Sequence, residues 1–291
     1  NENGYNGAEG IITYKSSIND FNYSVSGNFT YSRYKSISTY KPRFGNSWAE
    51  YRNSAEGRWG GIWWGYQVVG RFENEEEIRN YPINIDGQNN RTLLPGDFIY
   101  KDVNEDGVIN WMDERPIGYP DSWSPMISYG GTIAMNWKNI DLTIDLAGAT
   151  MQSWYQNYEL RNPFHAGGNS PAYLLEDRWH RADPYDPESE WIPGRYPAIR
   201  NGNVGPNHRN SDFWLTNVWF LRLRNIELGY TLPKEWVSKV NVDRLRFYVT
   251  GSNLVSFDNV NGFEIDPEIS ANASVVYPQQ RTIVVGLNLS L

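Results

Sequence analysis

The chain has 291 residues, of which 21% are charged, a formal net charge of −8 at pH 7 and no cysteine. This acidic balance argues against a nucleic-acid-binding function, because phosphates require a basic surface. No run approaches the roughly 18 apolar residues of a transmembrane helix, so a helical membrane anchor is excluded within the chain.

Apolar and polar residues alternate from near the start of the chain, which is typical of β-strands. We predict a weak strand at residues 12–15, a turn at residues 17–20 and a clear strand at residues 21–33. One face of the clear strand carries Phe21, Tyr23, Val25, Gly27, Phe29 and Tyr31, and the other face is small and polar. A soluble β-sandwich and a membrane barrel both explain such a strand.

A hairpin is predicted at residues 127–137 and 140–146, with a tight turn at Lys138-Asn139. Trp137 lies at its tip, as in the aromatic girdle of a membrane barrel. Asp141 and Asp145 fall on the polar face, and two carboxylates suit a water-filled lumen better than a packed interior.

The last third of the chain adds three strands. In residues 220–231 the alternation changes phase near Asn225, which indicates a β-bulge. A turn with about one helical turn at residues 234–242 leads to a strand at residues 245–251. The final strand, residues 281–291, has the length of a tilted membrane strand. Its apolar face carries Ile283, Val285, Leu287, Leu289 and Leu291.

These segments give seven spanning strands whose connections alternate in length. The turns near 17–20, 137–139 and 232–243 are short, and those at 35–124, 149–218 and 256–280 are long. In bacterial barrels short turns face the periplasm and long loops face outward, which predicts a C-terminus in the periplasm. Because complete barrels have an even number of strands, we expect that the chain lacks an N-terminal part and that residues 281–291 close the barrel.

An alternative count makes residues 62–72 an eighth strand, which would give a small closed eight-stranded barrel. This segment is apolar on both faces. That pattern favours a strand buried among the loops over a strand between lipid and water.

Residues 102–113 match an EF-hand-type calcium loop. Its predicted ligands are Asp102, Asn104, Asp106, Val108 through its carbonyl, Asn110 and Asp113. Gly107 stands at the position of the sharp turn, and Asp113 replaces the usual glutamate, which lowers the expected affinity. The alternative is a turn rich in Asp and Asn that needs no metal.

Tryptophans are concentrated in the long loops and have two interpretations: stacking on sugars or partners, or filling small loop cores. They are Trp48, Trp59, Trp63, Trp64, Trp123, Trp179 and Trp191. His165, His180 and His208 lack the spacing of a zinc site or a catalytic triad, and we expect surface histidines. No catalytic residues are predicted.

Taken in order, several segments resemble the C-terminal part of the SusC/RagA-like TonB-dependent outer-membrane transporters of Bacteroidota. They are residues 20–31, 64–72, 95–107 (PGDFIYKDVNEDG), 117–118, 220–233 (FLRLRNIELGYTLP), 251–254 and 277–278. Leu291 stands where the family usually ends on an aromatic residue, and Glu105 where a glycine is common.

The resemblance implies an all-β fold, a section of a large antiparallel transmembrane barrel of about 22 strands. Residues 35–124 and 149–218 would be long extracellular loops, and the plug domain would not be in this chain. The implied function is import of a large nutrient, glycan or peptide, across the outer membrane. A SusD-like surface lipoprotein would dock on the long loops, and the TonB complex would act through a part outside this chain.

A rival from another class is a secreted calcium-binding β-sandwich, either a lectin or an adhesin. It would explain the calcium-like loop and the tryptophans. It would not explain the alternating connection lengths or the apolar terminal strand.

Overall fold

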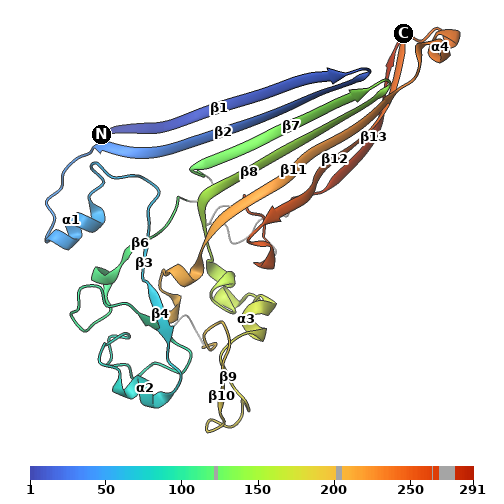
Figure 1. Cartoon of the computed structure of the whole chain (residues 1–291). Coiled ribbons are helices and arrows are strands. Elements are labelled where there is room, and N and C mark those ends of the chain that lie inside the picture. Colours follow the sequence, from blue (N-terminus) through green and yellow to red (C-terminus); the bar gives the residue numbers. More distant parts are fainter. Residues whose placement is uncertain (121–123, 201–204, 264, 269–278) are drawn as a thin grey trace.

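A computed structural model describes residues 1–120, 124–200, 205–263, 265–268 and 279–291 of the chain. One antiparallel sheet of seven long strands dominates it, in the order β1-β2-β7-β8-β11-β12-β13 (Figure 1). The strands are β1 (Glu2–Ile18), β2 (Phe21–Ser38), β7 (Ile127–Trp137), β8 (Ile140–Tyr155), β11 (Leu215–Thr231), β12 (Arg244–Asp258) and β13 (Thr282–Ser290). Each lies beside the next long strand along the chain, and the seven predicted strands are confirmed.

The first strand is much longer than the predicted residues 12–15. β1 has 17 residues and pairs with β2 along its whole length, from Glu2 opposite Ser38 to Ile18 opposite Phe21. Its first half is rich in Gly and Asn and carries no hydrophobic alternation. The turn is also tighter than predicted, because only Asn19 and Asp20 lie outside the two strands, and Asn19 has φ 51°.

The predicted bulge near Asn225 is confirmed. The pairing of β11 with both β8 and β12 shifts register between Leu223 and Asn225. Leu223 and Ile226 therefore point to the same face although three positions separate them, and the apolar face continues across the irregularity.

Cross-strand pairing collects most of the apolar residues of β2, β7, β8, β11, β12 and β13 on one face. One row runs through Tyr23, Met135, Leu142, Leu228, Val249 and Val285, each opposite the next. Leu228, Val249 and Val285 are 52%, 45% and 76% exposed. A continuous exposed apolar face of this extent requires a lipid or protein covering.

The opposite face is small and polar. Its central rows carry Ser24, Ser26, Thr132, Thr143, Asp145, Glu227, Arg246 and Asn288. Thr132 donates to Asp145 across two strands at 2.8 Å. Within the described ranges the seven strands form one layer whose outer strands, β1 and β13, each have a single neighbour. This single layer differs from a β-sandwich, in which two sheets cover one another.

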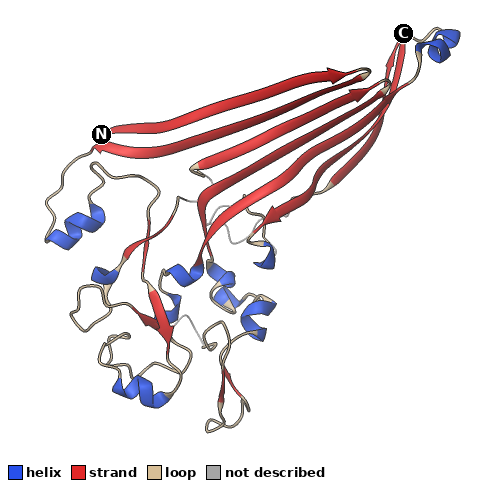
Figure 2. Ribbon diagram, in the orientation of Figure 1, coloured by secondary structure: helices blue, strands red, loops and turns tan. Residues whose placement is uncertain are grey.

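The rest of the chain is built of short elements at one end of the sheet (Figures 1 and 2). Its helices are α1 (Ser47–Asn53), α2 (Glu75–Asn80) and α3 (Ala172–Glu176), with short 3-10 turns at Trp111–Asp113, Tyr158–Leu160, His165–Gly167, Pro206–His208, Asp212–Trp214 and Asn261–Phe263. Its strands form three ribbons: β3 (Trp63–Gly65) with β6 (Arg115–Gly118), β4 (Val68–Arg71) with β5 (Phe98–Tyr100), and β9 (His180–Arg181) with β10 (Trp191–Ile192). At the other end lie the short turns, α4 (Lys234–Val237) and the 3-10 turn Ser238–Val240.

The two longest connections pack together into one unit, here called the loop body (residues 59–118, 156–200 and 205–214). Its core joins residues from both connections: Phe72, Ile85, Phe98, Tyr100 and Ile109 from the first, and Leu174, Tyr196 and Trp214 from the second. Trp214 is 1% exposed. Residues 62–72 supply β3 and β4 of this unit, so the count that makes them an eighth spanning strand is wrong.

No helix in the described part of the chain has the length and apolar character needed to cross a membrane.

Candidate functional site

The polar face of the sheet carries an ionic cluster near the short-turn end. Arg246 of β12 donates from Nε to Asp141 of β8 at 3.0 Å and from Nη2 to Glu227 of β11 at 2.7 Å. Thr250 donates to Glu227 at 2.8 Å. Gly229 makes the cluster possible, because a Cβ there would lie 2.3 Å from the Arg246 guanidinium. The cluster ties three strands together on the face opposite the apolar one.

A second feature of the polar face is a segment that folds back over it after β12. We call residues 259–263 and 265–268 the strap. Asp258 ends the strand and accepts from the Val260 backbone N–H at 3.1 Å. Val260 is fully buried against Trp154 and Val218, and the Phe263 ring lies 5.3 Å from that of Trp154.

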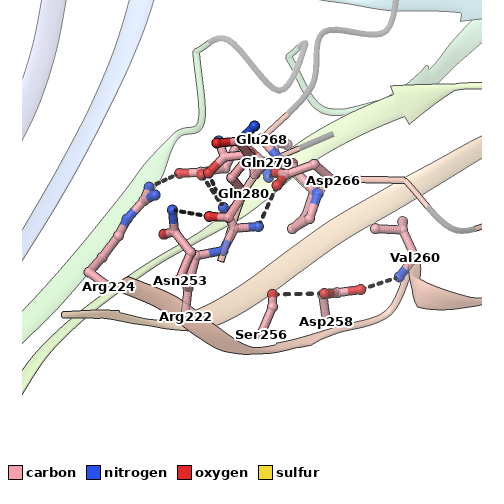
Figure 3. Close-up of polar contacts among 12 residues, drawn as sticks. Arg222, Arg224, Asn253, Ser256, Asp258, Val260, Asp266, Glu268, Gln279 and Gln280 are labelled. Carbon is pink, nitrogen blue, oxygen red and sulfur yellow. Dashed lines mark hydrogen bonds and ion pairs between the residues drawn. The ribbon is translucent and has the colours of Figure 1, made fainter. Parts of the chain in front are cut away.

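Two arginines of β11 hold the end of the strap (Figure 3). Arg222 donates to Asp266 and to Glu268, both at 2.7 Å, and to Gln279 at 3.1 Å. Arg224 forms an ion pair with Glu268. The Arg222 side chain is 5% exposed and that of Asp266 is 9% exposed. The strap therefore covers the polar face at the loop end of the sheet through buried ion pairs.

The calcium-like loop is preformed in part. Asp102 accepts the Gly107 backbone N–H at 2.8 Å through Oδ2, whereas its Oδ1 is buried and has no hydrogen-bond partner in the described part of the chain. Asp106 Oδ2 lies 2.9 Å from the Asn104 amide and 3.5 Å from the Asn110 amide. Hydrogen bonds from the Asn104 side chain and the Val108 backbone lower the pKa of Asp106, so this carboxylate is ionised at neutral pH.

Asp113 has a structural task in the same loop. It is 1% exposed and accepts the backbone N–H groups of Val103 at 2.9 Å and Asn110 at 2.8 Å, the second as part of a capping box. Among the residues that the structure describes, no group of three or more His, Cys, Asp or Glu side chains could hold a metal ion. Any ion here would depend on amide and backbone oxygens together with Asp102 and Asp106.

The loop tryptophans do not gather at one place. Trp48 and Trp64 lie edge to face at 6.5 Å, with Tyr51 and Trp111 beside them. Arg52, Arg58 and Arg115 stack on these rings. This aromatic cluster is partly exposed, since Tyr51 and Trp111 are 45% and 44% exposed.

The remaining tryptophans serve separate local contacts. Trp59 lies under Arg33, Trp63 stacks on Tyr155, and Trp191 lies under Arg181. Trp179 is 8% exposed and covers Gly96, where a Cβ would lie 2.3 Å from the indole ring. Trp123 and residues 277–278 lie outside the described residues.

The three histidines have intermediate exposure, and His208 differs from the other two in its charged surroundings. Burial, followed by the positive charges of Arg161 and Arg200, lowers its pKa to about 4. Its Nδ1 is buried and has no hydrogen-bond partner within the described ranges. His165 Nδ1 lies 3.3 Å from a carboxylate oxygen of Glu159, and His180 Nδ1 lies 2.9 Å from the Arg178 carbonyl oxygen.

A buried carboxylate joins the two long connections. Asp97 is fully buried, accepts from Leu94 at 2.9 Å and from the Asn207 side chain at 2.7 Å, and pairs with Arg200. Burial raises the pKa of Asp97, and the Arg200 charge and the hydrogen bonds oppose this rise. Sequence reasoning missed this contact, which joins residues more than one hundred positions apart.

The described geometry defines a class: a section of an antiparallel barrel wall with an apolar face, a polar face and large loops at one end. Comparison with known proteins supports this class.

No family model matches the chain. It is 24% identical over 250 residues to TonB-dependent receptor P3 of Formosa agariphila, a match that covers 80% of this chain and 22% of the receptor. It is 26% identical over 242 residues to receptor P26 of the same organism, covering 79% and 22%.

Solved structures show the same fold. The RagAB peptide importer in its open-open state aligns with a TM-score of 0.63 and 20% identity, over 99% of this chain and 28% of the other. The RagAB peptide transporter aligns with a TM-score of 0.64 and 19% identity, over 98% and 29%. The predicted resemblance to SusC/RagA-like TonB-dependent transporters is confirmed, and the chain has the fold of a section of their barrel. It spans about a fifth of the length of the curated relatives, which are receptors rather than enzymes, as predicted.

Proposed function

We propose that this chain is part of a transporter that imports a large nutrient, glycan or peptide, across the outer membrane with energy from TonB. The observation that carries the proposal is the separation of the sheet into one continuous apolar face and one polar, ion-paired face. The apolar face would lie against outer-membrane lipid and the polar face would line the lumen.

The arrangement of the connections supports an orientation. The short turns lie at one end of the sheet and the long connections at the other (Figure 1). By the rule for bacterial barrels, the short-turn end and the C-terminus face the periplasm and the loop body faces outward. Residues 35–124 and 149–218 would then dock a SusD-like surface lipoprotein. The aromatic cluster at Trp48 and Trp64 would contact ligand or partner, and TonB would act through a part outside this chain.

Deletion of the gene for the full-length protein tests this function. Two fluorescently labelled probes are used, a mixed peptide digest and a glycan digest. We expect the deletion to abolish uptake of one of them. In wild-type cells, we expect a protonophore to abolish uptake of the same probe. The protein should stay in the membrane fraction after a carbonate wash. Unchanged uptake of both probes, or release by the wash, would contradict the proposal.

We also propose that the loop at residues 102–113 holds calcium in the full-length protein. The unpartnered, buried Oδ1 of Asp102 supports this, because the other oxygen of the same carboxylate is already fixed by Gly107. Asn104, Asp106, the Val108 carbonyl and Asn110 would complete the ligands, and Asp113 would position the loop. The ion would stabilise the loop against Asn84, whose backbone N–H donates to the Gly107 carbonyl at 2.8 Å.

Calorimetry with the purified protein measures this binding. We expect a dissociation constant on the order of 10⁻⁴–10⁻³ M, as for extracellular calcium modules. Asp102→Ala should weaken binding by about tenfold or more, because it removes an ionised ligand. Glu105→Gln is the matched control, since it removes a negative charge from an exposed position of the same loop that supplies no ligand. Absence of heat at millimolar calcium, or equal losses in both variants, would contradict the assignment.

A further inference from the structure

The loop body contains a cavity of about 420 Å³ that neither the proposed transport nor the calcium site accounts for. Residues 161–166 and 196–200 border it, together with His208. Much of its wall is apolar: Leu174, Tyr196 and Trp214 are 2%, 4% and 1% exposed. A ligand here would place an apolar or ring-shaped body against these side chains.

The polar side of the cavity is cationic. The hydrogen-bond acceptors of Arg161 in the described part of the chain are all neutral, namely the Tyr155 hydroxyl, Asn210 Oδ1 at 3.3 Å and Asn157 Oδ1 at 3.5 Å. Across the described ranges, no carboxylate lies within ion-pair distance of Arg161. Arg200 also borders the cavity, but Asp97 balances its charge. One positive charge therefore remains uncompensated at the wall.

Hydrogen-bonding capacity is also unused around this cavity. Four buried atoms have no hydrogen-bond partner among the residues that the structure describes: the Nε atoms of Arg161 and Arg200, Nδ1 of His208 and Oδ1 of Asn162. Asn162 is 6% exposed. Buried polar groups in proteins almost always have a partner, and those that do not require a bound species or a functional reason. Three of these four atoms are nitrogens, which can donate a hydrogen bond to an anion.

We propose that this cavity binds a ligand bearing a single carboxylate, held by Arg161 and His208 with its apolar or ring-shaped body against Tyr196 and Trp214. A monoanion matches the one uncompensated charge, whereas a dianionic phosphate would leave a negative charge in an apolar surround. Both the C-terminal carboxylate of a peptide and the uronate of an acidic glycan have this chemistry. The proposal goes beyond import, because binding can be measured without transport.

Two matched ligand pairs test the proposal on the purified full-length protein in detergent. The peptide pair is N-acetyl-Ala-Ala-Phe and its C-terminal amide, and the glycan pair is the methyl glycoside of galacturonate, which bears one carboxylate, and its methyl ester. We expect calorimetry to show binding of at least one free acid and at least tenfold weaker binding of its neutral counterpart. The pair that responds identifies the source of the carboxylate, and this comparison requires no variant.

Variants then locate the site. Arg161→Gln should weaken binding of the responding acid at least tenfold, while Arg79→Gln, which removes an exposed arginine of the same loop body away from the cavity, should leave it unchanged. Failure of both acids to bind, equal binding of acid and neutral ligand, or full binding to the Arg161→Gln protein would overturn the proposal. Loss of nutrient uptake in the deletion strain would be unaffected by any of these results, so failure here leaves the proposed import function standing.

Discussion

Replacement of Val285 by arginine is expected to destabilise the sheet in a bilayer by about 2–4 kcal/mol, the cost of a cation on the lipid face near mid-depth. Val285 lies opposite Val249 in β13 and is 76% exposed on the apolar face. Its row continues through Leu228 and Leu142, so the new guanidinium would have no polar neighbour within the face. The substitution destabilises the protein that is folded in the bilayer, so the yield of folded protein should also decrease.

The same substitution one residue earlier is the matched control. Val284 lies opposite Thr250 on the polar face, and Glu227 accepts a hydrogen bond from Thr250. We expect Val284→Arg to change stability little, because the arginine would lie in water near a carboxylate. Urea titration of the full-length protein in lipid vesicles measures both variants. Equal destabilisation would show that the two faces of β13 are in the same environment, and the barrel interpretation would then be wrong.

Alternation predicted the number and order of the long strands but not their lengths. In β8 the alternation ends after Leu146, yet the strand continues to Tyr155. Residues 152–155 are buried on both faces of the strand where it enters the loop body, so no polar face remains to mark it. In β1 the apolar face is missing instead. Its Gly- and Asn-rich start forms a strand only through pairing with β2.

The candidate sites were predictable only where their residues are close in sequence. The calcium-like loop is contiguous, and its turn at Gly107 has the expected positive φ of 80°. The sequence pattern did not indicate that the Asp113 side chain caps the backbone N–H of Asn110. The contact between Arg246 and Asp141 joins residues 105 positions apart, and that between Arg222 and Asp266 joins residues 44 apart. For both contacts, the sequence offered one indication: an arginine at a polar-face position of a predicted strand.

Arg222→Gln is expected to release the strap. A buried ion pair that loses one partner leaves an uncompensated charge, at a cost of roughly 3–5 kcal/mol. Here two carboxylates, Asp266 and Glu268, would lose their shared guanidinium in a site where the arginine side chain is 5% exposed. The apolar anchors Val260 and Phe263 would remain, so we expect local opening of the strap rather than unfolding of the sheet.

Hydrogen exchange of the backbone amides in the strap measures the opening, because exchange follows the local free energy. A loss of about 3 kcal/mol corresponds to exchange faster by more than about 100-fold. Arg224→Gln is the control: its side chain is 35% exposed and, among the described residues, its one ion pair is with Glu268, so about 1 kcal/mol or less is expected. Adding Asp266→Asn to Arg222→Gln should restore part of the protection by removing one unpaired buried charge. Unchanged exchange in Arg222→Gln would mean that apolar packing alone holds the strap against the polar face, and that the ion pairs do not contribute to its closure.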